Sequence, residues 1–157
     1  MSLPELFRRY GTAVLAKNSE IAHEWIARPA GCDLTVPAPS PNGFDIRFEV
    51  ELNAVTLYWG NWHTRFEPTT DVDKMIEELF GLLRDMLSPD MRIREVYAGS
   101  HPYRGYLESS DGTHWTAEHE MGLIFWNYFG KRSVKTYSNS ILPGRMRKAD
   151  NDAAPKL

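Results

Sequence analysis

The stretch from Val55 to Leu87 constrains the fold more than any other part of the sequence. It opens with two segments of strand-forming residues, 55–59 and 62–66, and Gly60-Asn61 lies between them. A two-residue connection of this composition predicts a tight turn between antiparallel strands. The sequence therefore predicts a hairpin that leads directly into the next element.

That next element is a helix over residues 70–88. Thr69 or Thr70 can cap it, and Asp71 and Asp73 lie in its first turn, where negative charge favours the helix. Pro89 ends it. Its apolar positions recur at helical spacing and form one wide stripe: Val72, Met75, Ile76, Leu79, Phe80, Leu83, Met86 and Leu87.

Strict alternation precedes the hairpin. Between Phe44 and Leu52 every second residue is apolar and the intervening ones are charged. This pattern is typical of an antiparallel strand with one buried face. Together with the hairpin it predicts a three-stranded meander.

The N-terminal residues 2–27 are predicted to form a helix, with Asn18-Ser19 as a break or frayed turn. Ser2 and Glu5 form a capping box around Pro4. The proline-rich segment 35–43 is predicted to be an extended surface connection.

The second half of the chain predicts more antiparallel sheet. Asp111-Gly112 suits a type I′ turn. The expected strands are 91–98, 103–110, 113–118, 123–129 and 133–138, with the last two paired around Gly130-Lys131. The fold class is thus α+β: a single antiparallel sheet of about six to eight strands packed with two helices. Residues 1–142 form the domain, and the tail 143–157 is expected to be disordered.

Composition bounds the function. A chain of 157 residues with 42% hydrophobic residues suits one globular domain, and a net charge of −3 argues against a nucleic-acid binder. Cys32 is the only cysteine, which fits a reducing compartment. With neither a signal-peptide pattern nor an apolar run near the ~20 residues of a membrane span, we expect a soluble cytoplasmic protein without membrane contact.

Two clusters carry candidate binding residues. His63 and Arg65 share one face of their strand and could bind an anion or exchange protons, or could simply belong to a polar outer sheet face. Residues 101–106 are rich in tyrosine and arginine and could bind a ligand from a loop; alternatively Gly99-Ser100-His101-Pro102 is merely a turn between strands and Tyr103 covers a sheet edge. The candidate ligand- or partner-binding residues are Trp59, Trp62, His63, Arg65, His101, Tyr103, Arg104 and Tyr106.

No set of catalytic residues is evident, so we expect no enzyme, no cofactor and no metal. His114 and His119 are five residues apart and would point to opposite faces of a strand. Residues 123–129 are apolar or aromatic at nearly every position. If both helices cover the same sheet face, an aromatic surface stays open, which favours a protein partner or a homodimer.

Residues 59–66, Trp-Gly-Asn-Trp-His-Thr-Arg-Phe, with the acidic helix that follows, resemble small bacterial α+β proteins in which an aromatic-His-x-His-Phe type of motif precedes a helix. The similarity covers residues 44–98, and Arg65 stands where the pattern often has its second histidine. Some of these proteins look like immunity proteins of polymorphic-toxin systems. The resemblance implies a non-enzymatic protein of the bacterial cytoplasm that neutralises a partner protein by binding it.

The alternative hypothesis is a small-ligand-binding protein or hydrolytic enzyme. Its pocket would lie on the sheet face around His63, Arg65 and Arg104.

Overall fold

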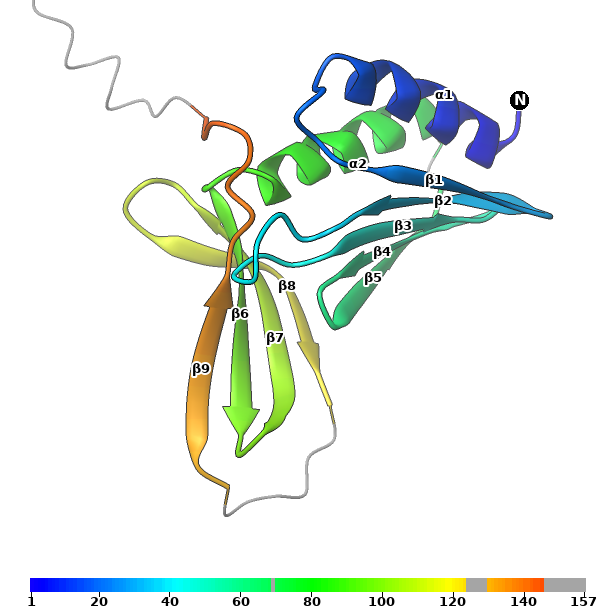
Figure 1. The fold of residues 1–157 in the computed structure, drawn as a ribbon. Coiled ribbons are helices and arrows are strands. Elements are labelled where there is room, and N and C mark those ends of the chain that lie inside the picture. Colours follow the sequence, from blue (N-terminus) through cyan, green and yellow to red (C-terminus); the bar gives the residue numbers. More distant parts are fainter. Residues whose placement is uncertain (69, 124–129, 146–157) are drawn as a thin grey trace, which may run out of the picture.

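The computed structural model describes residues 1–68, 70–123 and 130–145. Its elements follow in the order α1 (Leu3–Ala16), β1 (Glu24–Arg28), β2 (Gly31–Val36), β3 (Ile46–Val50), β4 (Val55–Trp59), β5 (Trp62–Phe66), α2 (Val72–Met86), β6 (Met91–Ala98), β7 (His101–Ser110), β8 (Trp115–Gly122) and β9 (Arg132–Tyr137). The broad α+β prediction is confirmed (Figure 1).

The prediction of a single sheet is wrong. The strands form a five-stranded sheet of order β1-β2-β3-β4-β5 and a four-stranded sheet of order β8-β7-β6-β9. All neighbouring strands in both sheets are antiparallel. The second sheet runs away from the helices at a steep angle to the first (Figure 1). Helix α2 lies between β5 and β6 in the chain, and β6 pairs with β7 and β9, not with β5.

The prediction of one N-terminal helix over residues 2–27 is also wrong in its second half. Helix α1 ends at Ala16, where the side-chain amide of Asn18 donates to the carbonyl of Val14. Residues 24–28 form β1 and pair with β2. Trp25 has helical spacing in the sequence, but it reaches α1 from this strand, with its ring 6.2 Å from that of Phe7.

Strand β2 has no counterpart in the predictions. Cys32, Leu34 and Val36 alternate toward the core, and each is at most 3% exposed. The prolines of the predicted connection begin only at Pro37, directly after the strand. Thr35 and Val36 therefore belong to the sheet, and the extended connection is shorter than predicted.

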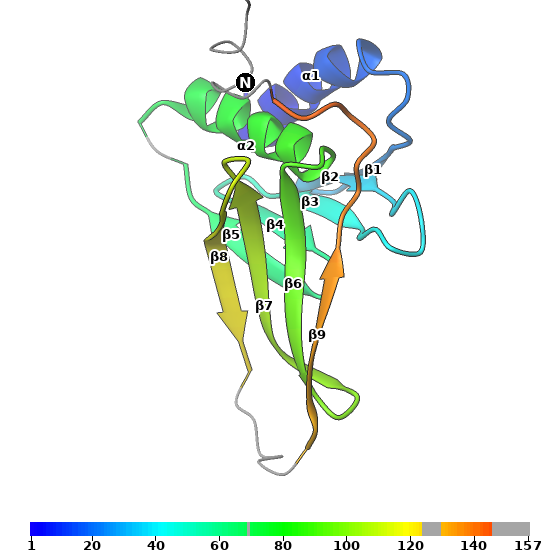
Figure 2. The ribbon, with the colours of Figure 1, turned by 90° about the vertical axis from the view of Figure 1, so that its left-hand side faces the viewer.

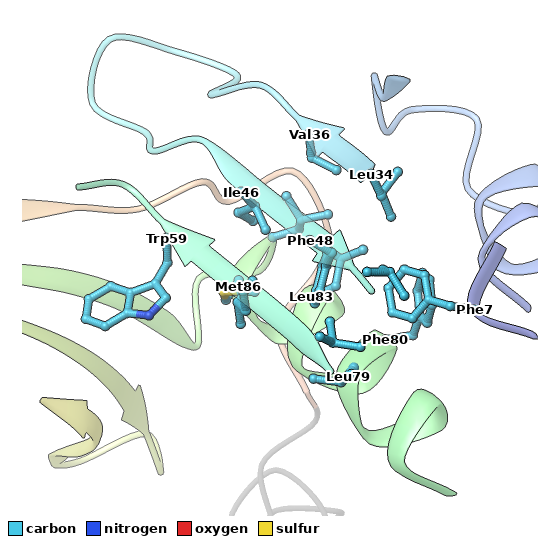
Figure 3. Packing of buried hydrophobic residues seen from close by; sticks show 14 of the residues in the cluster. Phe7, Leu34, Val36, Ile46, Phe48, Trp59, Leu79, Phe80, Leu83 and Met86 are labelled. Atoms are coloured by element: carbon cyan, nitrogen blue, oxygen red, sulfur yellow. The ribbon is translucent and has the colours of Figure 1, made fainter. Parts of the chain in front are cut away.

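Both helices cover the same face of the first sheet. Helix α1 contacts β2, β3 and α2. Phe7 of α1 lies with its ring centroid 4.8 Å from Phe80 of α2 and 5.4 Å from Phe48 of β3 (Figure 3). This aromatic cluster closes the centre of the core. The opposite face of the first sheet is left without a helix (Figure 1).

The second sheet contributes one face to the same core. Met91, Ile93 and Leu107 are buried and belong to the hydrophobic cluster that includes the first sheet and both helices. The two sheets approach closely at Gly105, where a Cβ atom would lie only 2.2 Å from Cε2 of Trp62. Glycine is therefore needed at this position for the two sheets to meet.

The remaining elements agree with the predictions except at their ends. Asp71 caps α2, because its carboxylate accepts the backbone N–H of Lys74. The paired residues of β7 and β8 end at Ser110 and Trp115, and the N–H of Asp111 donates to the carbonyl of His114 at 3.2 Å, so the turn is centred on Gly112-Thr113, one residue later than predicted. Strand β9 pairs with β6. Residues 124–129 of the predicted strand 123–129 and residues 146–157 of the predicted tail 143–157 lie outside the described residues.

Candidate functional site

The outer face of the second sheet carries a connected set of polar and aromatic side chains. Along β6, Met91, Ile93 and Glu95 are buried, whereas Arg92 and Arg94 alternate with them and are partly exposed. Figure 2 shows the four strands with no helix in front of them. We call this surface the arginine–aromatic face; it comprises Arg92, Arg94, Tyr103, Arg104, Tyr106, Glu108, Trp115, Glu120 and Arg132.

Glu108 organises the centre of this face. Its carboxylate accepts a hydrogen bond from Nε of Arg92 and another from Nε of Arg94, both at 2.7 Å. Only 6% of the Glu108 side chain is exposed. Burial raises the pKa of this carboxyl, but the hydrogen bonds and charges of Arg94 and Arg92 outweigh burial and hold the pKa below its usual value. Glu108 is therefore ionised at neutral pH and fixes both arginines.

The same arginines lie over aromatic rings. The guanidinium carbon of Arg92 is 4.0 Å from the ring centroid of Trp115, and that of Arg94 is 4.1 Å from the ring centroid of Tyr106. These distances are well within the ~6 Å range of cation–π attraction. A carboxylate on one side and a ring on the other leave each guanidinium little freedom.

Near the turn between β6 and β7, arginines again lie beside tyrosine rings and a glutamate, but at longer distances. Nη1 of Arg104 lies 3.5 Å from the hydroxyl of Tyr106 and 3.8 Å from Oε1 of Glu120. The guanidinium of Arg132 lies 4.9 Å from the ring of Tyr103. Tyr103, Arg104 and Tyr106, three of the candidates from the sequence, thus lie together on one surface. His101 is exposed at the start of β7, with Nδ1 3.3 Å from the hydroxyl of Ser100.

The face is positive within a chain that is negative overall. Four arginines stand against two glutamates on it, whereas the whole chain carries −3. A hollow of about 220 Å³ lies at the end of the face near Arg92. It is lined by Arg92 and Trp115 together with Asn42, Pro89, Thr136, Tyr137 and Ser138. The face thus combines excess positive charge, aromatic rings and a small depression.

The other sequence candidates lie on the first sheet. His63 is exposed on the helix-free face, its ring 5.6 Å from that of Tyr58, and Arg47 covers the Tyr58 ring at 4.1 Å. Arg65 on the same face pairs with Glu51 at 3.1 Å. These contacts are the cross-strand pairs of a polar outer face.

Trp59 and Trp62 are core residues. Trp59 is fully buried and Trp62 is 4% exposed. The indole N–H of Trp59 lies 3.3 Å from the hydroxyl of Thr64, and that of Trp62 donates to Glu95 at 2.9 Å. Both side chains hold the structure together and offer no surface to a ligand.

The structure does not bring His63, Arg65 and Arg104 together in a pocket. His63 and Arg65 lie on β5, and Arg104 lies on β7 of the other sheet. Among the described residues, no hydrogen bond or ion pair joins Arg104 to either of them. The cavities of about 770, 410 and 220 Å³ are lined by other residues.

A cavity of about 770 Å³ lies between α2 and the second sheet, and nothing in the sequence indicates it. Its wall is mainly acidic and includes Asp85, Asp90 and Glu118. Arg145, the cation on its rim, is held by Asp85 through two hydrogen bonds of 2.8 and 2.9 Å. His119 also lines it, and burial lowers the pKa of this imidazole. These polar groups come from three separate segments of the chain, around residues 85–90, 118–119 and 145.

Within residues 1–68, 70–123 and 130–145, no group of three histidine, cysteine or carboxylate side chains is placed to hold a metal ion. None of the helices in this part of the chain has the length and apolar character needed to cross a membrane. Comparison with protein-family models, with curated proteins and with solved structures finds no match to this chain.

Sequence reasoning missed Arg92, Arg94, Glu108 and Trp115. A signal for the first two was present, because Arg92 and Arg94 alternate with the apolar Met91 and Ile93. That alternation predicts two arginines on one exposed strand face. The partners of these arginines come from other strands, and only the register reveals them.

Proposed function

We propose that this chain is a non-enzymatic binding protein that neutralises a partner protein by binding to it, in the manner of an immunity protein. The observation that carries the proposal is the arginine–aromatic face. Its side chains lie on a sheet, not on a loop, and are held in place by Glu108. A rigid surface of this kind binds without a large cost for ordering its side chains.

The composition of the face supports a protein partner. Arginine, tyrosine and tryptophan are the residue types most enriched at the energetic centres of protein interfaces. Trp115 on β8 is 39% exposed and Val134 on β9 is 57% exposed. These two residues lie on opposite edge strands, β8 and β9, with the fixed charges of Arg92 and Arg94 on β6 between them. Apolar groups and fixed charges on one surface match the mixture of contacts that such interfaces use.

The resemblance of residues 59–66 to immunity-like proteins agrees with this function but concerns other residues. Trp62 and His63 lie on β5, where Trp62 packs against the second sheet. In this proposal, that motif has a structural role: it sets the position of the sheet that carries the binding face.

The test is a capture experiment with the whole chain as bait, in an extract of the cells that produce it. The bait is compared with Arg104→Glu, which reverses an exposed charge on the face, and with Arg9→Glu, which makes the same change on α1. The proposal is supported if the wild type and Arg9→Glu capture a protein that Arg104→Glu does not, and if the purified protein shows the same difference in binding. Retention of every captured protein by Arg104→Glu contradicts it.

A functional readout follows from the same pair. If the captured protein is toxic when expressed alone, the wild type and Arg9→Glu should restore growth on co-expression, and Arg104→Glu should not. Equal protection by all three would place the contact elsewhere on the molecule.

A further inference from the structure

We propose that the arginine–aromatic face recognises an acidic segment of the partner protein, with one partner side chain seated in the hollow beside Arg92 and Trp115. This inference rests on the proposed function and adds the chemistry of the partner. The occupant is a protein surface rich in aspartate and glutamate.

The two central guanidinium groups keep positive charge and N–H donors for a ligand. Arg92 and Arg94 share one carboxylate, that of Glu108, so the trio keeps a net positive charge. Both hydrogen bonds to Glu108 use Nε. The Nη amino groups of both arginines have no hydrogen-bond partner among the described residues. Carboxylates are the groups in a protein that best match such paired N–H donors.

These N–H donors are also held in position before a ligand arrives. Each guanidinium lies against a ring at about 4 Å, and each side chain is only about 30% exposed. An incoming carboxylate therefore meets a charge whose orientation is fixed. Arg104 and Arg132 lie further along the same face and extend the positive field toward the β6–β7 turn.

The size of the hollow also bears on its occupant. At about 220 Å³ it is smaller than the ~300 Å³ from which small-molecule pockets usually start. One amino-acid side chain of a larger surface suits this volume better than a free metabolite does. Arg92 at its wall favours an acidic side chain, and Trp115 offers an apolar contact to its methylene groups.

Single-stranded nucleic acid suits the face less well. Binders of that class stack bases on open aromatic rings. Here the rings of Trp115 and Tyr106 are each covered on one side by a guanidinium. The net charge of −3 also lacks the wide positive field that draws a nucleic acid to its binder.

The first experiment uses defined probes and fluorescence anisotropy. A short labelled peptide of alternating glutamate and tyrosine is titrated with the intact chain. The matched probes are the same peptide with lysine in place of glutamate, and an oligothymidine single strand. We expect the glutamate peptide to bind, the lysine peptide to fail, and added salt to weaken the binding.

The variants locate the contact. Arg94→Ala should lower the affinity for the glutamate peptide roughly tenfold, the loss expected for one ordered charge-assisted contact. Arg104→Ala should weaken it too, and it leaves the bonds of Glu108 intact, so it remains informative if Arg94→Ala folds poorly. Arg9→Ala, an equal loss of charge on α1, should leave the affinity unchanged. Circular dichroism confirms that each variant is folded.

Three results would overturn the inference. The first is a glutamate peptide that binds all variants equally or not at all. The second is oligothymidine that binds through the face instead. The third is self-association in sedimentation that Arg104→Ala abolishes, which would make a second copy of the chain the occupant. The capture experiment separates this failure from that of the proposed function. A captured partner that depends on Arg104 but contacts it through a basic or neutral surface would leave the binding function standing and remove the acidic partner.

Discussion

The indole N–H of Trp62 donates a 2.9 Å hydrogen bond to Oε1 of Glu95, and this bond joins the two sheets inside the core. Glu95 is 2% exposed. Its other oxygen accepts from the hydroxyl of Tyr97 at 2.5 Å. Burial and the hydrogen bond to Glu95 raise the pKa of Tyr97, so the phenol stays a donor at any ordinary pH. The buried carboxylate is thus satisfied by neutral donors from both sheets.

Replacing Trp62 by phenylalanine should destabilise the protein by about 1–3 kcal/mol, the cost of leaving a buried acceptor without its donor. The remaining donor to the same oxygen, the side chain of Asn61, is 3.4 Å away and too distant to compensate. Urea unfolding followed by far-ultraviolet circular dichroism measures the change. Trp115→Phe, which alters an exposed indole, should change stability by less than about 0.5 kcal/mol. Equal effects of the two variants would mean that the Glu95 bond contributes nothing.

Gly105→Ala should destabilise the protein strongly, because its Cβ would lie 2.2 Å from Cε2 of Trp62. The strain of overpacking costs about 1–3 kcal/mol or more. Gly81→Ala is the matched control on α2, where an added Cβ meets nothing within 4 Å. It should stabilise the helix by about 0.5–1 kcal/mol. Thermal unfolding of both variants checks the opposite signs, and a neutral Gly105→Ala would mean that the sheets can move apart at little cost.

Phe80→Ala should cost about 3–5 kcal/mol, as truncation of a buried aromatic side chain does. Phe80 is 4% exposed and packs against Phe7 and Phe48 (Figure 3). The control is Glu77→Ala on the exposed side of the same helix, which should change the unfolding free energy by less than about 0.5 kcal/mol. Denaturant titration of the two variants separates core packing from helix propensity. A loss below about 1 kcal/mol for Phe80→Ala would show that this side chain is not a central core residue.

Local sequence patterns identified the elements whose partners are close in the chain. The alternation of 44–52 and the Gly60-Asn61 turn place β3, β4 and β5 correctly, and the apolar stripe of 70–88 places α2. Strand β1 escaped because Trp25 fits a helical period as well as a strand. Its identity is decided by pairing with β2, a contact that periodicity does not contain.

The division into two sheets depends on interactions distant in sequence. Strand β9 pairs with β6 across the whole of β7 and β8. Trp62 packs on Gly105, forty-odd positions along the chain. Nothing in the sequence around Trp62 or Gly105 indicates that the two residues pack against each other. The candidate site shows the same limit: tyrosine and arginine at 103–106 were predicted as binding residues, but Glu108, which orders the face, looks like any solvent-exposed glutamate in the sequence.

The last prediction uses that glutamate. Because Arg94 and Arg92 hold the pKa of Glu108 below its ordinary value of 4.5, the folded chain releases this proton more readily than the unfolded chain does. The stabilisation is therefore fully present above pH 4.5 and is lost as the pH falls through the lower folded-state pKa. Glu108→Gln should cost about 2 kcal/mol at neutral pH, the contribution of hydrogen bonds to charged groups, and much less in acid. Urea titrations of the wild type and Glu108→Gln at a series of pH values measure this difference.

The control is Glu120→Gln, which alters an exposed carboxylate 3.8 Å from Arg104 and should lower the free energy of unfolding by under about 1 kcal/mol at every pH. A Glu108→Gln deficit that stays constant from neutral to acid pH would mean that the charge of Glu108 is not what fixes the arginines, and the preorganised face would lose its physical basis.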